Sequence, residues 1–166
     1  VRAAAFKPGL APSAITTRSY IFPDHVLTQP ANPAGFPSLW DSPCTIGSNC
    51  ADTPGDYEMD PQVINNVADN SRAMARQGLV SIPTLSIVTD VNLLFGPAQG
   101  AYVRRESDNP QPVSVEYILP DGTPGFQQDC GYEIQGQTSP TDSGGNWKSK
   151  KLSMRLIFKG EYGPSK

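Results

Sequence analysis

The sequence is poor in the residues on which most enzyme chemistry depends. Its 166 residues include a single histidine, His25, and three cysteines. It contains neither a glycine-rich phosphate loop followed by lysine and serine or threonine, nor a nucleophile elbow. One imidazole weakens every triad or cysteine–histidine hypothesis. We therefore expect no enzymatic activity and no cofactor, and we interpret His25, next to Asp24, as a turn or surface residue rather than half of an acid–base pair.

Basic charge and long apolar runs are also scarce. The chain has 13 Lys and Arg against 16 Asp and Glu, a formal net charge of −3. A nucleic-acid-binding surface needs an excess of basic residues to displace counterions, so this balance argues against nucleic acid as a partner. No apolar run approaches the roughly 18 residues of a membrane-spanning helix, so we expect no membrane span.

Proline and glycine, in contrast, are abundant, with 17 and 15 residues. Internal prolines remove backbone donors, which excludes long helices and coiled coils. Alternating apolar residues predict strands in the last third of the chain, and Asp60-Pro61 predicts the start of two short helices over 61–77. Further strands are predicted at 1–6, 14–22, 79–89, 101–104, 113–119, 126–134 and 152–159. We expect a mainly β fold, an antiparallel β-sandwich with short helices and long loops.

The chain divides into a short N-terminal part and one globular part. Residues 1–13 form a predicted strand and a linker, because Lys7-Pro8-Gly9 interrupts the strand pattern. Residues 14–166 form the β-rich globular domain. The chain begins without methionine and stops soon after a strong strand pattern, so we expect it to be cut from a longer polypeptide.

Two cysteines enclose a short loop. Cys44 and Cys50 are separated by five residues that include glycine, serine and asparagine, which favour a tight turn. We expect a disulfide, typical of an exported protein, with two free thiols as the alternative. Cys130 is left over and is interpreted as a free, buried, small apolar residue. The proline-rich region 30–58 is expected to be anchored by the disulfide and by Phe36, Trp40 and Tyr57.

Two weaker sites depend on residue type alone. Acidic residues suitable for calcium gather before the first predicted helix, although without EF-hand spacing: Asp52, Asp56, Glu58 and Asp60. The alternative is a solvated loop with Asp60 as a helix cap. Trp40 and Trp147 are candidates for stacking on sugar rings, which implies a glycan as partner. The alternative role for such aromatics is to anchor loops or fill the core.

Several stretches resemble known bacterial surface proteins. Residues 1–13, VRAAAFKPGLAPS, resemble the last strand of a chitobiase C-terminal-like sandwich module. Six further stretches resemble the region that precedes the kinase-like domain in CotH-family surface proteins: TRSYIF (17–22), DYEMDP (56–61), SIPTLSI (81–87), LFG (94–96), PVSVEY (112–117) and KLSMRLIFK (151–159). The resemblance implies a β-rich fold in an extracellular, multidomain context. It does not imply phosphoryl transfer, because the catalytic part of that family lies further downstream.

The N-terminal strand directs the functional hypothesis. In the resembled module this strand belongs to a preceding sandwich, and a lone strand cannot satisfy its own backbone groups. We therefore expect a non-enzymatic extracellular structural subunit that polymerises head-to-tail into a pilus-like fibre or other cell-surface polymer by strand exchange. The assembly residues would be Val1, Arg2, Ala3, Ala4, Ala5 and Phe6. The alternatives are an accessory domain of a CotH-like enzyme, which pairing of residues 1–6 inside their own subunit would favour, and a carbohydrate-binding module.

Overall fold

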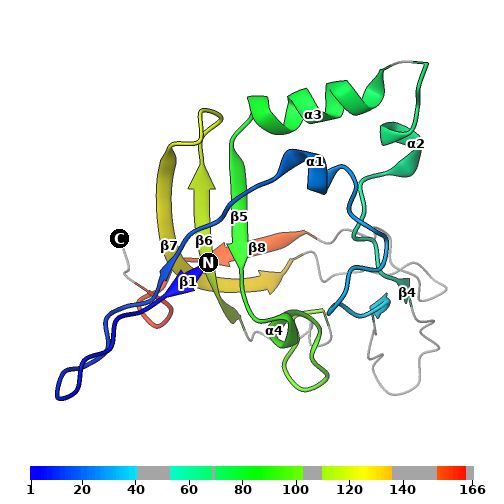
Figure 1. The fold of residues 1–166 in the computed structure, drawn as a ribbon. Helices are drawn as coiled ribbons and strands as arrows, with labels where there is room; N and C mark the ends of the chain where they lie inside the picture. The colour runs from blue at the N-terminus through cyan, green and yellow to red at the C-terminus, as the bar shows by residue number, and fades with distance from the viewer. Residues whose placement is uncertain (41–52, 69, 103–109, 136–152, 164–166) are drawn as a thin grey trace, which may run out of the picture.

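The central element is a curled antiparallel sheet of four strands. The computed structural model describes residues 1–40, 53–68, 70–102, 110–135 and 153–163 (Figure 1). The strands follow the order β5-β6-β7-β8. Their bounds are Thr84–Val88 for β5, Gln111–Ile118 for β6, Pro124–Ile134 for β7 and Met154–Ile157 for β8. Strand β7 bends along its length, so that its second half and β8 run across the direction of β5 (Figure 1).

The predicted mainly β sandwich is not confirmed. The structure is mixed, with about 27% strand and 19% helix. In the described residues the other strands form only two-stranded pairs. One joins β1 (Arg2–Ala3) to β2 (Thr16–Thr17), and the other joins β3 (Leu39–Trp40) to β4 (Thr53–Pro54). What the sequence predicted correctly is the antiparallel sheet with short helices.

The β6–β7 hairpin forms where alternation predicted it. Val113 pairs with Cys130 and Val115 with Gln128, so these side chains share one face of the sheet. The connecting turn places Gly122 at a φ of +82°, a conformation that glycine adopts without steric cost. Of the short strand predicted at 101–104, Ala101 and Tyr102 lie in a turn instead, and residues 103–104 lie outside the described residues.

The helices are short, and proline sets several of their boundaries. Their bounds are Pro23–Val26 for α1, Pro61–Ile64 for α2, Ser71–Ser81 for α3 and Val91–Phe95 for α4. The predicted start at Asp60-Pro61 is confirmed, since Asp60 Oδ1 accepts a hydrogen bond of 2.8 Å from Gln62 N. Helix α3 continues past Gly78, where we expected it to stop. It ends because Ile82 precedes Pro83 and is extended, with φ −117° and ψ 155°. No helix in the described part of the chain has the length and apolar character needed to cross a membrane.

The core lies against one face of the sheet. Val113, Val115, Cys130, Tyr132 and Ile134 from β6 and β7 pack there. No second sheet covers them in the part of the chain that the structure describes. Aromatic side chains from β3, from loops and from α4 do so instead: Trp40, Tyr57, Phe95 and Tyr102. The described parts of the region 30–58, residues 30–40 and 53–58, are therefore anchored to the core by aromatics, as predicted for Trp40 and Tyr57.

The first 18 residues form a two-stranded extension that we call the N-terminal arm. Arg2 pairs with Thr17 and Ala3 with Thr16, and the chain turns back beyond residue 6 (Figure 1). The arm projects from the body of the molecule (Figure 1). The strands predicted over 1–6 and 14–22 are thus reduced to two residues each. The expectation that residues 2–6 pair mainly with another subunit is not met at Arg2, Ala3 and Ala5, because the Pro8-Gly9 turn brings residues 13–17 of the same chain beside them.

Candidate functional site

The base of the N-terminal arm is fixed to the centre of the sheet by one buried carboxylate. Arg18 Nη1 donates to Glu116 Oε1 at 2.8 Å, and Ser19 N donates to Glu116 Oε2 at 2.6 Å. The Ser19 and Ser86 hydroxyls are 2.6 Å apart, which adds a contact to β5. Only 4% of the Glu116 side chain is exposed, against 49% for Arg18. Both carboxylate oxygens of Glu116 therefore hold the segment that leads out of the arm.

The surroundings of Glu116 keep it ionised. Burial alone would raise its pKa, but hydrogen bonds from Arg18 and Ser19, together with the charge of Arg18, outweigh burial and leave the pKa below its ordinary value. An ionised acceptor strengthens both hydrogen bonds. The anchor of the arm is therefore present at neutral pH and weakens only in acid.

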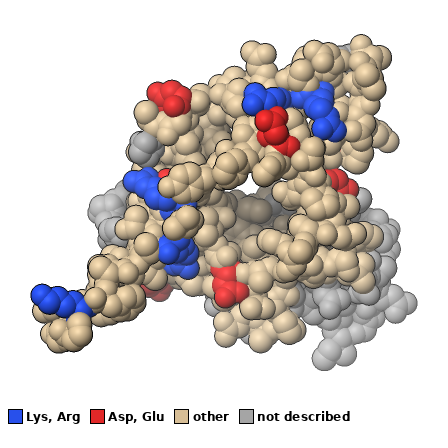
Figure 2. Space-filling view, in the orientation of Figure 1, with Lys and Arg blue, Asp and Glu red and all other residues tan. Residues whose placement is uncertain are grey.

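Beyond this anchor the arm exposes large apolar side chains. Val1 and Phe6 are each 78% exposed and Leu10 is 65% exposed, and Ile15 is exposed as well. The predicted assembly residues Val1, Arg2, Ala3, Ala4, Ala5 and Phe6 all lie in the arm, and of these only Ala4 is partly buried. The three charged side chains of the arm, Arg2, Lys7 and Arg18, are all basic. The arm thus combines apolar side chains with positive charge (Figure 2).

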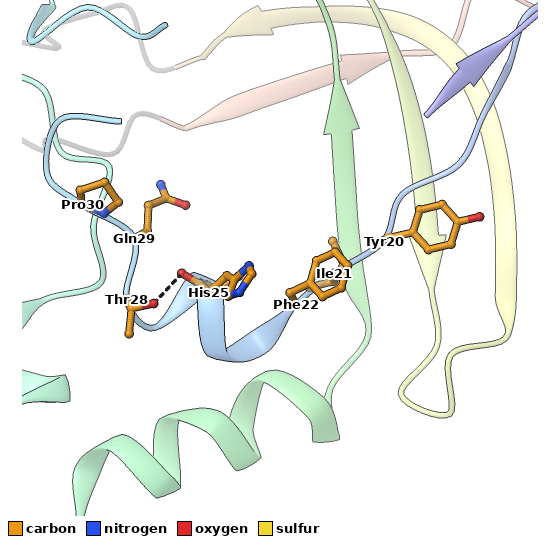
Figure 3. Close-up of a pocket in the computed structure, with 8 residues that line it drawn as sticks. Tyr20, Ile21, Phe22, His25, Thr28, Gln29 and Pro30 are labelled. Atoms are coloured by element: carbon orange, nitrogen blue, oxygen red, sulfur yellow. Dashed lines mark hydrogen bonds between the residues drawn. The ribbon is translucent and has the colours of Figure 1, made fainter. Parts of the chain in front are cut away.

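His25 belongs to α1 and borders an open pocket. The pocket has a volume of about 480 Å³ and is bordered by Tyr20, Phe22 and Gln29 (Figure 3). Asp24 does not engage His25 through its carboxylate, because both oxygens accept hydrogen bonds from Arg76, at 2.8 and 3.3 Å. That hydrogen bond to Arg76 lowers the pKa of Asp24. The interpretation of His25 as an exposed residue is confirmed.

The weaker candidates are placed only in part. Asp60 caps α2, the alternative role given for it, and Asp56 lines an aromatic pocket described below. The described residues include no group of three or more His, Cys, Asp or Glu side chains placed to hold a metal ion. Cys130 is free and buried, as predicted, and burial raises the pKa of its thiol. The predicted disulfide partners Cys44 and Cys50, together with Asp52 and Trp147, lie outside the described residues.

An aromatic pocket opens at the edge of the core. It has a volume of about 350 Å³. Its walls are mainly aromatic and aliphatic: Phe36, Trp40, Tyr57, Ile87, Leu94, Phe95, Tyr102, Tyr132 and Met154, with Asp56 and Thr89 as polar members. Trp40 is only 4% exposed, and its ring stacks on that of Phe95 at a centroid distance of 6.2 Å. Its role is to anchor the loop to the core, since little of its ring is left to stack on a sugar.

The polar atoms of this pocket differ in how well they are paired. Trp40 Nε1 donates to Tyr57 Oη at 2.7 Å, and Tyr57 Oη donates to the Pro37 carbonyl at 2.8 Å. Tyr132 is 1% exposed, and its hydroxyl has no hydrogen-bond partner among the described residues. Burial raises the pKa of Tyr102 to about 12, and that of Tyr132 is also raised by burial, so both hydroxyls are neutral at ordinary pH.

Sequence reasoning did not single out Tyr132, although a signal for it exists. Alternation along β7 places residue 132 on the same face as Cys130, which the sequence already marks as buried.

Comparison with family models, with curated proteins and with solved structures finds no match for this chain.

Proposed function

We propose that this chain is a non-enzymatic structural module that joins copies of itself head-to-tail through the N-terminal arm. The observation that carries the proposal is the projection of an arm with exposed Val1, Phe6 and Leu10 from the body of the molecule. The partner in each contact is a second copy of the chain. An exported, bacterial cell-surface location belongs to the proposal and is supported by the predicted disulfide.

The form of assembly differs from the exchange of a lone strand. Residues 2 and 3 already have partners at Thr17 and Thr16, so the arm acts as a preformed two-stranded element. An isolated two-stranded hairpin is marginally stable in water. Covering Phe6 and Leu10 on a neighbour would contribute about 1.5–3 kcal/mol for each fully buried side chain. The alternative is an accessory role in a CotH-like enzyme. Pairing of Arg2 and Ala3 inside their own chain favours it, whereas the comparisons add no support for it.

A surface that suits the arm lies elsewhere on the molecule. An apolar pocket of about 260 Å³ lies between the segment before α1, the end of α3 and the β6–β7 turn. Among the residues that line it, Tyr20, Ile82 and Leu119 are exposed. The segment that leaves the base of the arm lines this pocket, whereas the tip of the arm points away from the β6–β7 turn (Figure 1). Such a contact does not close on itself as a two-fold pair does, so repetition gives a chain of subunits.

Charge also favours the contact. Because the charged side chains of the arm are three basic ones, the remaining 148 residues carry a formal charge of −6 within the chain's total of −3. Asp121, in the turn beside the receiving pocket, is exposed and acidic. The positive arm of one copy therefore approaches a body of opposite charge, which favours association at low ionic strength.

The experiment compares assembly in variants of the arm with a matched control. Light scattering coupled to size-exclusion chromatography measures the mass of the wild type, of a chain lacking residues 1–13, of Phe6→Asp and of Val67→Asp. Val67 is also strongly exposed but lies between α2 and α3. We expect the wild type and Val67→Asp to assemble as concentration rises, and the other two to stay monomeric and folded. A wild type that is monomeric at every concentration, or a deletion that assembles normally, contradicts the proposal.

A further inference from the structure

The aromatic pocket has the properties of a small-molecule site that is independent of the N-terminal arm. Its volume of about 350 Å³ falls in the range of ligand pockets, roughly 300–1,000 Å³. In the part of the chain that the structure describes, no residue of the N-terminal arm lines this pocket. Its walls come from the loop after α1, from α4 and from β5, β7 and β8, so the sheet and the anchored loop hold it in shape.

The Tyr132 hydroxyl in this pocket lacks the hydrogen bonds that Trp40 Nε1 and Tyr57 Oη have. Trp40 Nε1 and Tyr57 Oη satisfy each other and the Pro37 carbonyl. The Tyr132 hydroxyl is buried in the core cluster and has no partner among the described residues. A buried hydroxyl without a partner is unfavourable by about 1–3 kcal/mol. A ligand that brings an acceptor to this hydroxyl relieves that cost, and a purely apolar ligand does not.

We propose that the aromatic pocket binds a neutral, planar aromatic molecule whose carbonyl oxygen or ring nitrogen accepts a hydrogen bond from Tyr132 Oη. The apolar lining favours a flat apolar body, because aromatic rings pack against one another in offset or edge-to-face geometry. Among the described residues the polar members of the lining are Asp56, Thr89 and the tyrosine hydroxyls.

Other ligand classes fit the lining less well. A carboxylate ligand would meet the negative charge of Asp56 in an apolar site, which is unfavourable. A sugar carries many hydroxyls that need partners, and the described part of the lining offers few polar groups. The neutral aromatic class satisfies the buried Tyr132 hydroxyl and adds no charge next to Asp56.

The test uses two probes of nearly equal shape, acetophenone, which has a carbonyl acceptor, and ethylbenzene, which has none. Dissociation constants are measured by following amide and indole N–H signals in nuclear magnetic resonance titrations of the wild type, Tyr132→Phe and Tyr117→Phe. Tyr117 lies on the same face of the sheet but outside the pocket, stacked on Phe126. We expect both probes to shift the Trp40 Nε1–H signal, with acetophenone binding the wild type about three to ten times more tightly.

The variants separate the role of the hydroxyl from a structural effect. In Tyr132→Phe the preference for acetophenone disappears while ethylbenzene binds as before, and Tyr117→Phe behaves as the wild type. The absence of saturable shifts at Trp40 for both probes overturns the proposal. So does an equal loss of affinity for both probes in Tyr132→Phe. These outcomes do not depend on assembly, because binding to the pocket is measured equally in the chain that lacks residues 1–13.

Discussion

Replacing Glu116 by glutamine tests whether one carboxylate holds the N-terminal arm to the sheet. The glutamine side chain would keep a single acceptor oxygen, whereas Glu116 accepts from Arg18 on one oxygen and from Ser19 on the other. At least one hydrogen bond to a charged group is therefore lost. Such bonds contribute about 1.5–3 kcal/mol each. Because Arg18 remains half-exposed and can be hydrated, no larger penalty for an uncompensated buried charge is added.

Thermal unfolding measures this loss. For a chain of this length 1 kcal/mol corresponds to about 2–4 °C, so Glu116→Gln lowers the midpoint by about 3–12 °C at pH 7. The control is Asp24→Asn, which removes an equally short ion pair, to Arg76, between side chains that are both exposed. We expect that control to leave the midpoint almost unchanged, because exposed pairs are screened by solvent. Equal midpoints for Glu116→Gln and the wild type refute the reasoning.

The same variant has a predicted pH dependence. The folded-state pKa of Glu116 lies below its ordinary value of 4.5, so its contribution is complete above about pH 4.5 and is lost as the pH falls through the lower, folded-state pKa. The difference in unfolding free energy between wild type and Glu116→Gln is therefore constant from pH 7 to pH 5 and shrinks in stronger acid. Local release of the arm is followed by trypsin cleavage after Arg18, which is faster in the variant. A difference that grows on acidification contradicts the assignment.

Two further predictions use thermal unfolding and peptide mapping. Gly131→Ala lowers the unfolding midpoint, because the new Cβ would lie 2.7 Å from Cε2 of Tyr162. Gly78→Ala raises the free energy of unfolding by about 0.5–1 kcal/mol, because the space around this position inside α3 is open. The opposite order of the two midpoints refutes the packing argument. Peptide mapping without reductant finds Cys44 joined to Cys50. Cys130 is alkylated only after unfolding, because it is fully buried and burial raises the pKa of its thiol. A bridge between Cys130 and either of the other two cysteines contradicts the prediction.

Local sequence signals predicted the elements that depend on local chemistry. The β6–β7 hairpin follows from alternation and from the Asp121-Gly122 turn, and the start of α2 follows from Asp60-Pro61. The burial of Cys130 follows from its position among apolar neighbours. In each case the determining residues lie within one turn or one strand pair of the feature they set.

The sequence did not predict features that depend on contacts distant along the chain. Nothing near Glu116 indicates that it is buried, since the residues that satisfy it, Arg18 and Ser19, lie almost 100 positions earlier. The aromatic pocket likewise brings Phe36, Phe95 and Tyr132 together from three separate segments. A second sheet was expected because so many residues favour strands. Aromatics from loops cover the core instead, and that substitution leaves no periodic signal.

The separation between Arg18 and Glu116 also orders the events of synthesis. The arm leaves the ribosome before the sheet, and its anchoring carboxylate is added 98 residues later. At translation rates of about 5–20 residues per second, the arm spends roughly 5–20 seconds without its attachment point. During that interval Val1, Phe6 and Leu10 are held by nothing downstream. The arm is thus presented before the sheet that anchors it has folded, so a chaperone or a finished subunit has time to engage the arm before Glu116 fixes it.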